Sequence, residues 1–217
     1  MTPGKRAFDI FFALGVILTL WPLMLGIALA IWAREGRPVL YGAERMRSPD
    51  RAFTLWKFRT MAGQDAGGVT GADKAGRITP LGRWLRRTRL DELPQVWNIL
   101  KGDVTLVGPR PPLRVYVERF PEIYGRVLQS RPGVTGLATI VFHRREERLL
   151  AACRDAAETD AVYCRRCIPA KARLDLIHAR HAGFCHDLRL IWVTILRIFG
   201  RGGTPGRRRP APPVTRG

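Results

Sequence analysis

The chain has 217 residues, 46% of them hydrophobic, which is enough for one domain with a buried core and excludes a wholly disordered chain. Lysine and arginine outnumber aspartate and glutamate by 37 to 18, so the formal net charge is +19 and indicates polyanionic partners. Charge alone does not distinguish among three possible partners: nucleic acid, anionic lipid headgroups and phosphorylated substrates.

The first part of the chain favours lipid among these partners. From Phe8 to Trp32 the residues are almost continuously apolar, with Asp9 as the only charge, and a segment of this length suits a membrane. A signal peptide is an alternative, since Lys5 and Arg6 precede the segment and residues 28–30 resemble a cleavage site, but the apolar run is too long for one. A straight spanning helix is the other alternative.

Pro22 argues against a straight helix, because proline in mid-helix removes a backbone hydrogen bond and pushes on the preceding turn. Both flanks are basic, so the positive-inside rule gives no orientation. Two limbs of about 12 residues would each be roughly 18 Å long, too short to cross a hydrocarbon core of about 30 Å. The sequence therefore predicts a re-entrant helix-break-helix over residues 1–34, entering and leaving by the cytoplasmic face. The carbonyl freed near Leu18 needs a donor, and Thr19 has the nearest hydroxyl.

Short strands are predicted at residues 38–41 and 53–58, which are rich in aromatic and β-branched residues. Residues 62–76 lack any periodicity and predict a mobile loop. Apolar residues then recur at helical spacing from Pro80 to Arg89, with arginines on the remaining faces. This pattern is typical of an amphipathic helix, either lying in the membrane interface or packed on its own domain. A second helix is predicted over Asp91–Leu100, with Asp91 or a neighbour as its cap.

The remainder predicts an α+β fold that is mostly helical. In chain order we expect a rigid turn at 108–112, helices to about 130, a turn at 131–136, a strand at 137–142, and helices ending in an amphipathic one at about 187–199. The predicted organisation is a membrane anchor (1–34), a small cytoplasmic domain with interfacial helices (35–200) and a disordered basic tail (201–217) that has too few apolar residues to fold.

Basic side chains and an Asp-Glu pair gather in three clusters in the middle of the chain: Lys57 and Arg59, Arg86 to Glu92, and Arg110. Arginine forks match phosphate oxygens. Two carboxylates would repel a phosphate unless a divalent cation lay between them, and Mg²⁺ prefers oxygen ligands shared with phosphates. A carboxylate beside such an ion can attack phosphorus and hold it covalently. In the plainer alternative, Asp91 and Glu92 cap a helix and pair with neighbouring arginines.

These motifs resemble the bacterial sugar transferase family, the monotopic phosphoglycosyl transferases that begin polysaccharide and glycoconjugate assembly. The resemblance covers about residues 5 to 200. It is carried by Lys5-Arg6-Ala7-Phe8-Asp9, Gly36-Arg37-Pro38, Glu44-Arg45, Lys57-Phe58-Arg59-Thr60-Met61, Arg77-Ile78-Thr79-Pro80-Leu81-Gly82, Leu90-Asp91-Glu92-Leu93-Pro94-Gln95, Asn98-Ile99-Leu100-Lys101-Gly102-Asp103, Val107-Gly108-Pro109-Arg110-Pro111 and Arg131-Pro132-Gly133-Val134-Thr135-Gly136.

The resemblance implies a Mg²⁺-dependent enzyme at the cytoplasmic face of the bacterial inner membrane, in contact with membrane lipids and without a nucleic-acid partner. Asp91 would attack the β-phosphorus of a UDP-sugar, release UMP and carry the phosphosugar, which polyprenyl (undecaprenyl) phosphate would then accept. Glu92 would orient Asp91 or share the Mg²⁺ with it. Phosphate groups would be bound by Lys57, Arg59, Arg86 and Arg110.

The chain departs from the family pattern at two places. Trp21 stands where the family usually has serine before the helix-breaking Pro22, and residues 137–140 replace a usual Trp-Ala-Gln-Val. A catalytically degenerate, membrane-tethered binding or scaffold protein therefore stays as the alternative function. The cysteines form a separate pattern, because Cys164-Arg-Arg-Cys167 with His181 and Cys185 has zinc-like spacing, although reduced thiols in a helical region explain it more simply.

Overall fold

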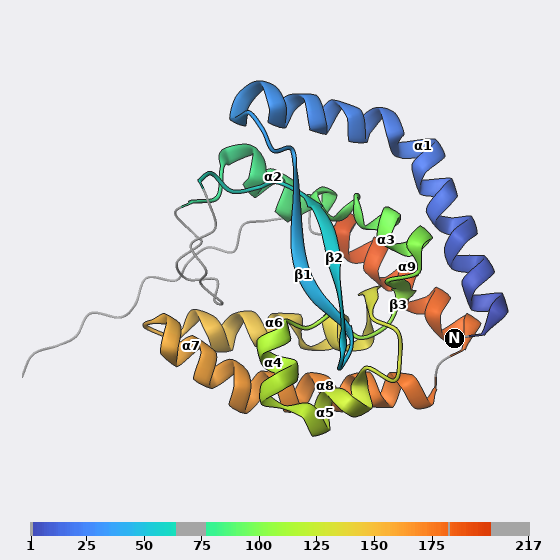
Figure 1. Cartoon of the computed structure of the whole chain (residues 1–217), viewed down its shortest axis with the longest axis vertical. Helices are drawn as coiled ribbons and strands as arrows, with labels where there is room; N and C mark the ends of the chain where they lie inside the picture. Colours follow the sequence, from blue (N-terminus) through green and yellow to red (C-terminus); the bar gives the residue numbers. More distant parts are fainter. Residues whose placement is uncertain (1, 64–76, 182, 201–217) are drawn as a thin grey trace, which may run out of the picture.

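The computed structural model of the chain describes residues 2–63, 77–181 and 183–200. These residues form the mostly helical α+β fold that the sequence predicts (Figure 1). The predicted tail (201–217) and most of the predicted loop (62–76) lie outside the described residues. The elements are, in order, α1 (Pro3–Glu35), β1 (Leu40–Ser48), β2 (Arg51–Phe58), α2 (Pro80–Thr88), the 3₁₀ turn η2 (Leu90–Glu92), α3 (Gln95–Lys101), β3 (Thr105–Val107), α4 (Arg114–Arg119), α5 (Pro121–Val127), β4 (Gly133–Thr135), α6 (Leu137–Ala151), α7 (Ala156–Val162), the π-helical η3 (Tyr163–Cys167), α8 (Ile168–Arg180) and α9 (Phe184–Gly200).

The apolar N-terminal segment is one continuous helix, α1, so the predicted division into two separate helices is not found. Pro22 lies inside the helix, and Figure 1 shows α1 changing direction near its middle, as a mid-helix proline favours. The Thr19 hydroxyl donates to the carbonyl of Gly15 at 2.7 Å and not to that of Leu18, so the expected donor is used elsewhere. Among the described helices, α1 alone is long and apolar enough to cross a membrane; the mean hydropathy of its 18-residue window is 2.3.

The N-terminal end of α1 is fastened to the rest of the fold. Asp9 is only 1% exposed, and its carboxylate accepts the Thr105 hydroxyl at 2.6 Å and the Leu106 amide at 3.3 Å. Arg6 donates to the carbonyls of Ile99 and Leu100 at 2.5 and 2.7 Å, at the C-terminal end of α3, where helix carbonyls lack the usual intrahelical donor. Asp9 is the one charged residue in the apolar run of the sequence, and in the structure its hydrogen bonds connect α1 to Thr105 and Leu106.

The C-terminal end of α1 packs against a different part of the same fold. Ile27 and Ile31 form an apolar cluster with Phe58 at the end of β2 and Leu85 of α2. Between the two ends the helix is largely uncovered, and Phe11 and Leu18 are 78% and 74% exposed. Figure 1 accordingly shows α1 arching over α2 and α3, while α4 to α8 gather at the opposite end of the molecule.

The strands β1 and β2 form an antiparallel hairpin, paired from Leu40 with Phe58 to Ser48 with Arg51. The prediction for β2 is confirmed, but the predicted first strand (38–41) is too short. The run from Gly42 to Arg45 contains no β-branched or aromatic residue, so the sequence gives no strand signal there. Pairing with β2 extends the strand regardless of propensity.

The secondary structure predicted for residues 131–142 differs from the structure. Residues 133–135 form β4, which pairs in parallel with β3, and the expected strand at 137–142 is the first part of α6. A short apolar run bounded by turns suits a buried strand and a buried helix equally well. Packing of α6 against its neighbours, chiefly α8, buries Ala138, Ile140 and Phe142. This tertiary packing favours the helix over the predicted strand.

Two glycines bring the turn at 108–112 against the segment that contains β4. A Cβ added to Gly133 would lie 2.1 Å from the backbone nitrogen of Gly108, and one added to Gly108 would lie 2.3 Å from the carbonyl oxygen of Arg131. Only glycine allows backbones to approach this closely. The contact fixes the turn that carries Arg110.

Candidate active site

The Asp-Glu pair lies on η2, between α2 and α3, and not at a helix cap. The helix α2 ends at Arg89, which has a left-handed backbone (φ 61°) and turns the chain into η2. Neither η2 nor α3 has a side-chain cap, and the N-cap of α3 is Pro94. The helix predicted over 91–100 is thus found only from Gln95 onward, as α3, and the alternative that Asp91 serves as its cap is wrong.

Asp91 is a buried residue with one unpaired carboxylate oxygen. It is 7% exposed, and its Oδ1 atom has no hydrogen-bond partner among the residues that the structure describes. Burial, assisted by the negative charge of Glu92, raises the pKa of Asp91, while Lys57, Arg86 and Arg89 act in the opposite direction. An unpaired buried carboxylate oxygen costs free energy, so such a group is a candidate for chemistry or for binding an ion.

Glu92 is held by three cations that contact the same oxygen. Its Oε1 lies 2.9 Å from Lys57 Nζ, 3.4 Å from Arg89 Nη1 and 3.6 Å from Arg110 Nη2. Burial alone would raise the pKa of Glu92, but Arg110, Lys57 and Arg89 outweigh it and lower that pKa to about 2. Glu92 is therefore ionised at neutral pH and holds these cations beside Asp91.

Arg86, on α2, is close enough to Asp91 for its charge to act on that carboxylate. Its Nε donates to the Thr60 hydroxyl at 2.8 Å, so the guanidinium is oriented by a neutral group and forms no ion pair with Asp91 or Glu92. The contact requires α2 to lie close to the backbone of Thr60. Gly82 allows this, because a Cβ at that position would lie 2.2 Å from the Thr60 carbonyl oxygen. Counting Lys57, Arg86, Arg89 and Arg110 against the two carboxylates, four positive charges face two negative ones, and the site attracts anions.

The structure places Arg59 outside this cluster, so it is not brought together with Lys57, Arg86 and Arg110, and its binding of phosphate stays a prediction. Its guanidinium donates to the backbone carbonyls of Glu35, Gly36 and Arg37 at 2.5 to 2.9 Å, where α1 ends. The prediction came from the basic cluster of Lys57 and Arg59 and from the family resemblance. However, β2 ends at Phe58, so the alternation that would put both side chains on one face does not continue to Arg59.

The sequence analysis did not single out two arginines near the Asp-Glu pair. Arg89 contacts Glu92, and its i, i+3 spacing could have indicated this. Arg45, on β1, is partly buried, and its pKa is lowered by burial and by the neighbouring charge of Arg110. The described residues provide Arg45 with no carboxylate partner. The Glu44-Arg45 motif was the only sequence signal for it.

Asp91 and Glu92 fit the requirements of a magnesium ion. The unpartnered Oδ1 of Asp91 adjoins an ionised carboxylate, and Mg²⁺ is commonly held by one or two carboxylates with substrate phosphates and water completing its shell. Within the described ranges, no group of three or more His, Cys, Asp or Glu side chains could hold a metal ion, so a zinc site at Cys164, Cys167, His181 and Cys185 is not found.

Comparison with known proteins supplies the context for this geometry. The family model described as bacterial sugar transferase matches residues 2–201. The exopolysaccharide production protein PSS of Rhizobium leguminosarum bv. phaseoli is 36% identical over 212 residues, covering 91% of this chain and 96% of that protein.

Two similar proteins are named as transferases. The UDP-glucose:undecaprenyl-phosphate glucose-1-phosphate transferase of Xanthomonas campestris pv. campestris is 31% identical over 204 residues, covering 91% of this chain and 39% of its own length. The undecaprenyl-phosphate glucose phosphotransferase of Komagataeibacter xylinus is 36% identical over 209 residues, with 91% of this chain and 36% of that protein covered. The chain thus spans well under half the length of these two relatives.

Proposed function

Because the chain belongs to the bacterial sugar transferase family, as its motifs predict, we propose that it transfers a phosphosugar from a UDP-sugar to undecaprenyl phosphate. The names of the relatives from Xanthomonas and Komagataeibacter support the acceptor, and the first of them supports the donor. The observation that carries the proposal is the buried, unpartnered Asp91 oxygen beside a carboxylate that three cations keep ionised.

In the proposed first step, an oxygen of Asp91 forms a bond to the β-phosphorus of the donor. The bond from this phosphorus to the oxygen that bridges to the α-phosphate breaks, and UMP leaves with the electron pair. In the second step an oxygen of undecaprenyl phosphate attacks the same phosphorus, the bond to Asp91 breaks, and undecaprenyl diphosphate sugar is formed.

The neighbouring residues suit these steps. The cations around Asp91 and Glu92 lie where negative charge develops on the phosphoryl oxygens, and they are already oriented by Glu92 and Thr60 before the donor binds. Burial makes the Asp91 carboxylate a stronger nucleophile, while Lys57, Arg86 and Arg89 favour its ionised form. Asp91 and Glu92 would hold Mg²⁺ with the donor phosphates, where the ion offsets repulsion between carboxylates and phosphates.

We further propose that α1 is re-entrant and that the enzyme lies at the cytoplasmic face of the bacterial inner membrane. Both ends of α1 pack against the same fold, through Asp9 at one end and Ile31 at the other, while its middle is exposed and apolar. This arrangement favours entry and exit at one face. Half-exposed Trp84 on α2 and Trp97 on α3 suit the membrane interface.

Labelling tests the topology separately from catalysis. A cysteine in place of Pro3 should not react with a membrane-impermeant reagent added from the periplasm, and its labelling there would mean a spanning helix. Pro22→Ala should let α1 straighten and expose the N-terminus to the reagent, since it restores the missing backbone donor.

The reaction is tested by incubating the purified chain with UDP-sugars that are ³²P-labelled at the β-phosphate, in the absence of acceptor. We expect a labelled peptide that contains Asp91, together with one UMP per chain. Asp91→Asn should abolish both while membrane attachment persists, and Asp50→Asn, in the exposed turn of the hairpin, is the matched control that should retain both. Chelation with EDTA should stop UMP release, and Mg²⁺ should restore it. If the unaltered chain releases no UMP and forms no labelled peptide with any donor, the scaffold alternative is favoured.

A further inference from the structure

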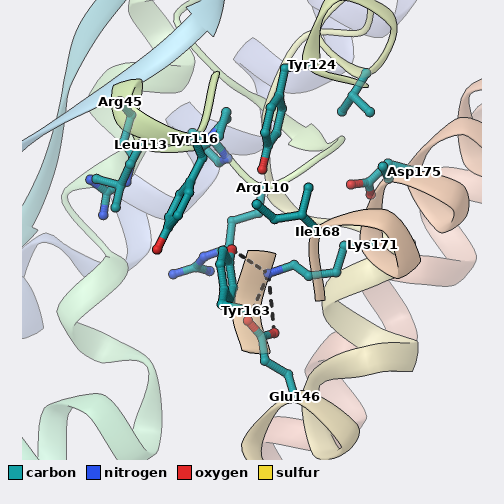
Figure 2. Close-up of a pocket in the computed structure, with 14 residues that line it drawn as sticks. Arg45, Arg110, Leu113, Tyr116, Tyr124, Glu146, Tyr163, Ile168, Lys171 and Asp175 are labelled. Carbon is teal, nitrogen blue, oxygen red and sulfur yellow. Dashed lines mark hydrogen bonds and ion pairs between the residues drawn. The ribbon is translucent and has the colours of Figure 1, made fainter. Parts of the chain in front are cut away.

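A pocket of about 160 Å³ shares a lining residue with the surroundings of the Asp-Glu pair (Figure 2). Arg110 connects the two places, because it lines the pocket and also lies 3.6 Å from Glu92. Arg45 lines the pocket as well and lies close enough to Arg110 for their charges to interact. Two arginines, one of them without a carboxylate partner, form a suitable place for a phosphate between the pocket and Asp91.

The inner part of the pocket is unusually polar. Lys171 Nζ lies 3.0 Å from Glu146 Oε1 and 3.3 Å from the Tyr163 hydroxyl, so a cation, a carboxylate and a phenol meet there. Asp175 stands one turn further along α8 and accepts a hydrogen bond from the backbone amide of Ala138. Figure 2 shows these side chains converging on the cavity from α6, η3 and α8.

Tyr124, on α5, contributes a free hydroxyl. The residue is 9% exposed, and Figure 2 shows its hydroxyl pointing into the pocket. Within the described residues this hydroxyl has no hydrogen-bond partner, whereas that of Tyr116 donates to Asp160 at 3.0 Å. A polar atom directed into a cavity without a protein partner is available to a ligand.

The size and chemistry of the pocket indicate its ligand. A cavity of about 150 Å³ holds a single six-membered ring. The ring must be joined to a phosphate, because the arginines separate the pocket from Asp91. Alternating donors and acceptors on the wall suit a ring with several hydroxyl groups. In a UDP-sugar the sugar is bonded directly to the β-phosphate, whereas the uracil ring is separated from the phosphates by ribose.

We propose that this pocket binds the sugar ring of the donor and that Tyr124, Glu146, Lys171 and Asp175 select which sugar is accepted. The proposal rests on the proposed function, since it takes the donor to be a UDP-sugar. The burial of Asp175 also affects how its carboxyl group can bind the sugar. Burial raises the pKa of Asp175 to about 7, despite the opposing charges of Lys171 and His178, so this carboxyl can donate as well as accept near neutral pH.

Binding measurements on the full chain in detergent test the proposal without turnover. Asp91→Asn is used as the parent so that donors stay intact, and dissociation constants are measured by calorimetry for UDP and for UDP-glucose, UDP-galactose, UDP-N-acetylglucosamine and UDP-N-acetylgalactosamine. We expect at least one sugar to bind more tightly than UDP. Tyr124→Phe should reduce this advantage about fivefold, as expected for the loss of one hydrogen bond. Asp175→Asn should change the order of preference among the sugars.

Tyr116→Phe is the matched control, because its hydroxyl is already donated to Asp160; the ratio of UDP to UDP-sugar affinity should stay within about twofold of the parent. The proposal is overturned if Tyr124→Phe weakens UDP and UDP-sugars equally, which would put the nucleoside in the pocket, or weakens neither. Equal affinity of the parent for UDP and every UDP-sugar would also overturn it. UMP release by the unaltered chain tests the reaction independently, so sugar-dependent binding without UMP release would contradict the proposed function alone.

Discussion

Asp9 offers the sharpest test of how α1 is fastened to the fold. Asp9→Ala removes the acceptor of the Thr105 hydroxyl and of the Leu106 amide, both of which are buried. A hydrogen bond to a charged group contributes about 1.5–3 kcal/mol, and the Thr105 hydroxyl can rotate toward another acceptor. We therefore expect the free energy of unfolding to fall by about 3–5 kcal/mol. Asp9→Asn retains one acceptor oxygen and should cost about 2 kcal/mol less.

The assay is chemical denaturation in detergent micelles, combined with proteolysis at the N-terminus. Asp9→Ala should expose the start of α1 to protease at denaturant concentrations where the rest of the fold is intact. A double-mutant cycle with Thr105→Val isolates the contact, and its coupling energy should be about 2 kcal/mol. If Asp9→Ala stays within about 1 kcal/mol of the parent, the buried carboxylate is not a tether and the reasoning is refuted.

Three further changes test the site and its surroundings. Lys57→Met removes a cation from Asp91 and Glu92, so UMP release should fall about 100-fold and the acid limb of the pH–rate profile should move to higher pH as the pKa of Asp91 rises further. Arg59→Lys loses the forked contacts with three carbonyls, so the melting temperature should fall by about 4 °C while the KM for donor is unchanged; a raised KM would restore Arg59 to the phosphate site. The pKa of Asp175 is about 7 in the folded chain and 3.8 ordinarily, so the folded chain binds the extra proton between these values and stability falls as pH rises through about 4 to 7, by at most about 4 kcal/mol. Asp175→Asn should remove this pH dependence of the melting temperature, and an unchanged pH dependence would mean that Asp175 ionises normally.

The sequence singled out Lys57, Glu92 and Arg110 as site residues because each lies in a motif of recognisable composition. The structure brings the three side chains together although Lys57 and Arg110 are 35 and 18 positions away from Glu92, and these ion pairs were not predicted. The helix α2 was predicted because its apolar residues recur at helical spacing, and Leu85 is indeed fully buried.

Long-range contacts decided the features that were missed. Nothing near Arg59 indicates that its guanidinium ends at the carbonyls of Glu35 and Gly36, because that contact requires the C-terminal end of α1 to return to β2. The prediction of a strand at 137–142 was wrong for a similar reason. A short apolar run in the sequence is compatible with a buried helix and with a buried strand, and only tertiary packing distinguishes them. The pocket of Figure 2 is assembled from β1, α4, α5, α6, η3 and α8, and no single segment of sequence indicates it.

The packing of α1 connects the apolar helix directly with the catalytic candidate. Leu90 and Leu93, on either side of Asp91 and Glu92, pack in the same apolar cluster as Ile27 and Ile31 of α1. Asp91 thus lies between two residues that pack against the same cluster as the apolar helix. Any change in the direction of α1 at Pro22 would move this cluster, and with it the position of η2 relative to the cations on β2 and in the 108–112 turn. The apolar helix and the carboxylate that we propose as the nucleophile are therefore packed together, and we expect substitutions in the helix to alter turnover even where they leave membrane attachment intact.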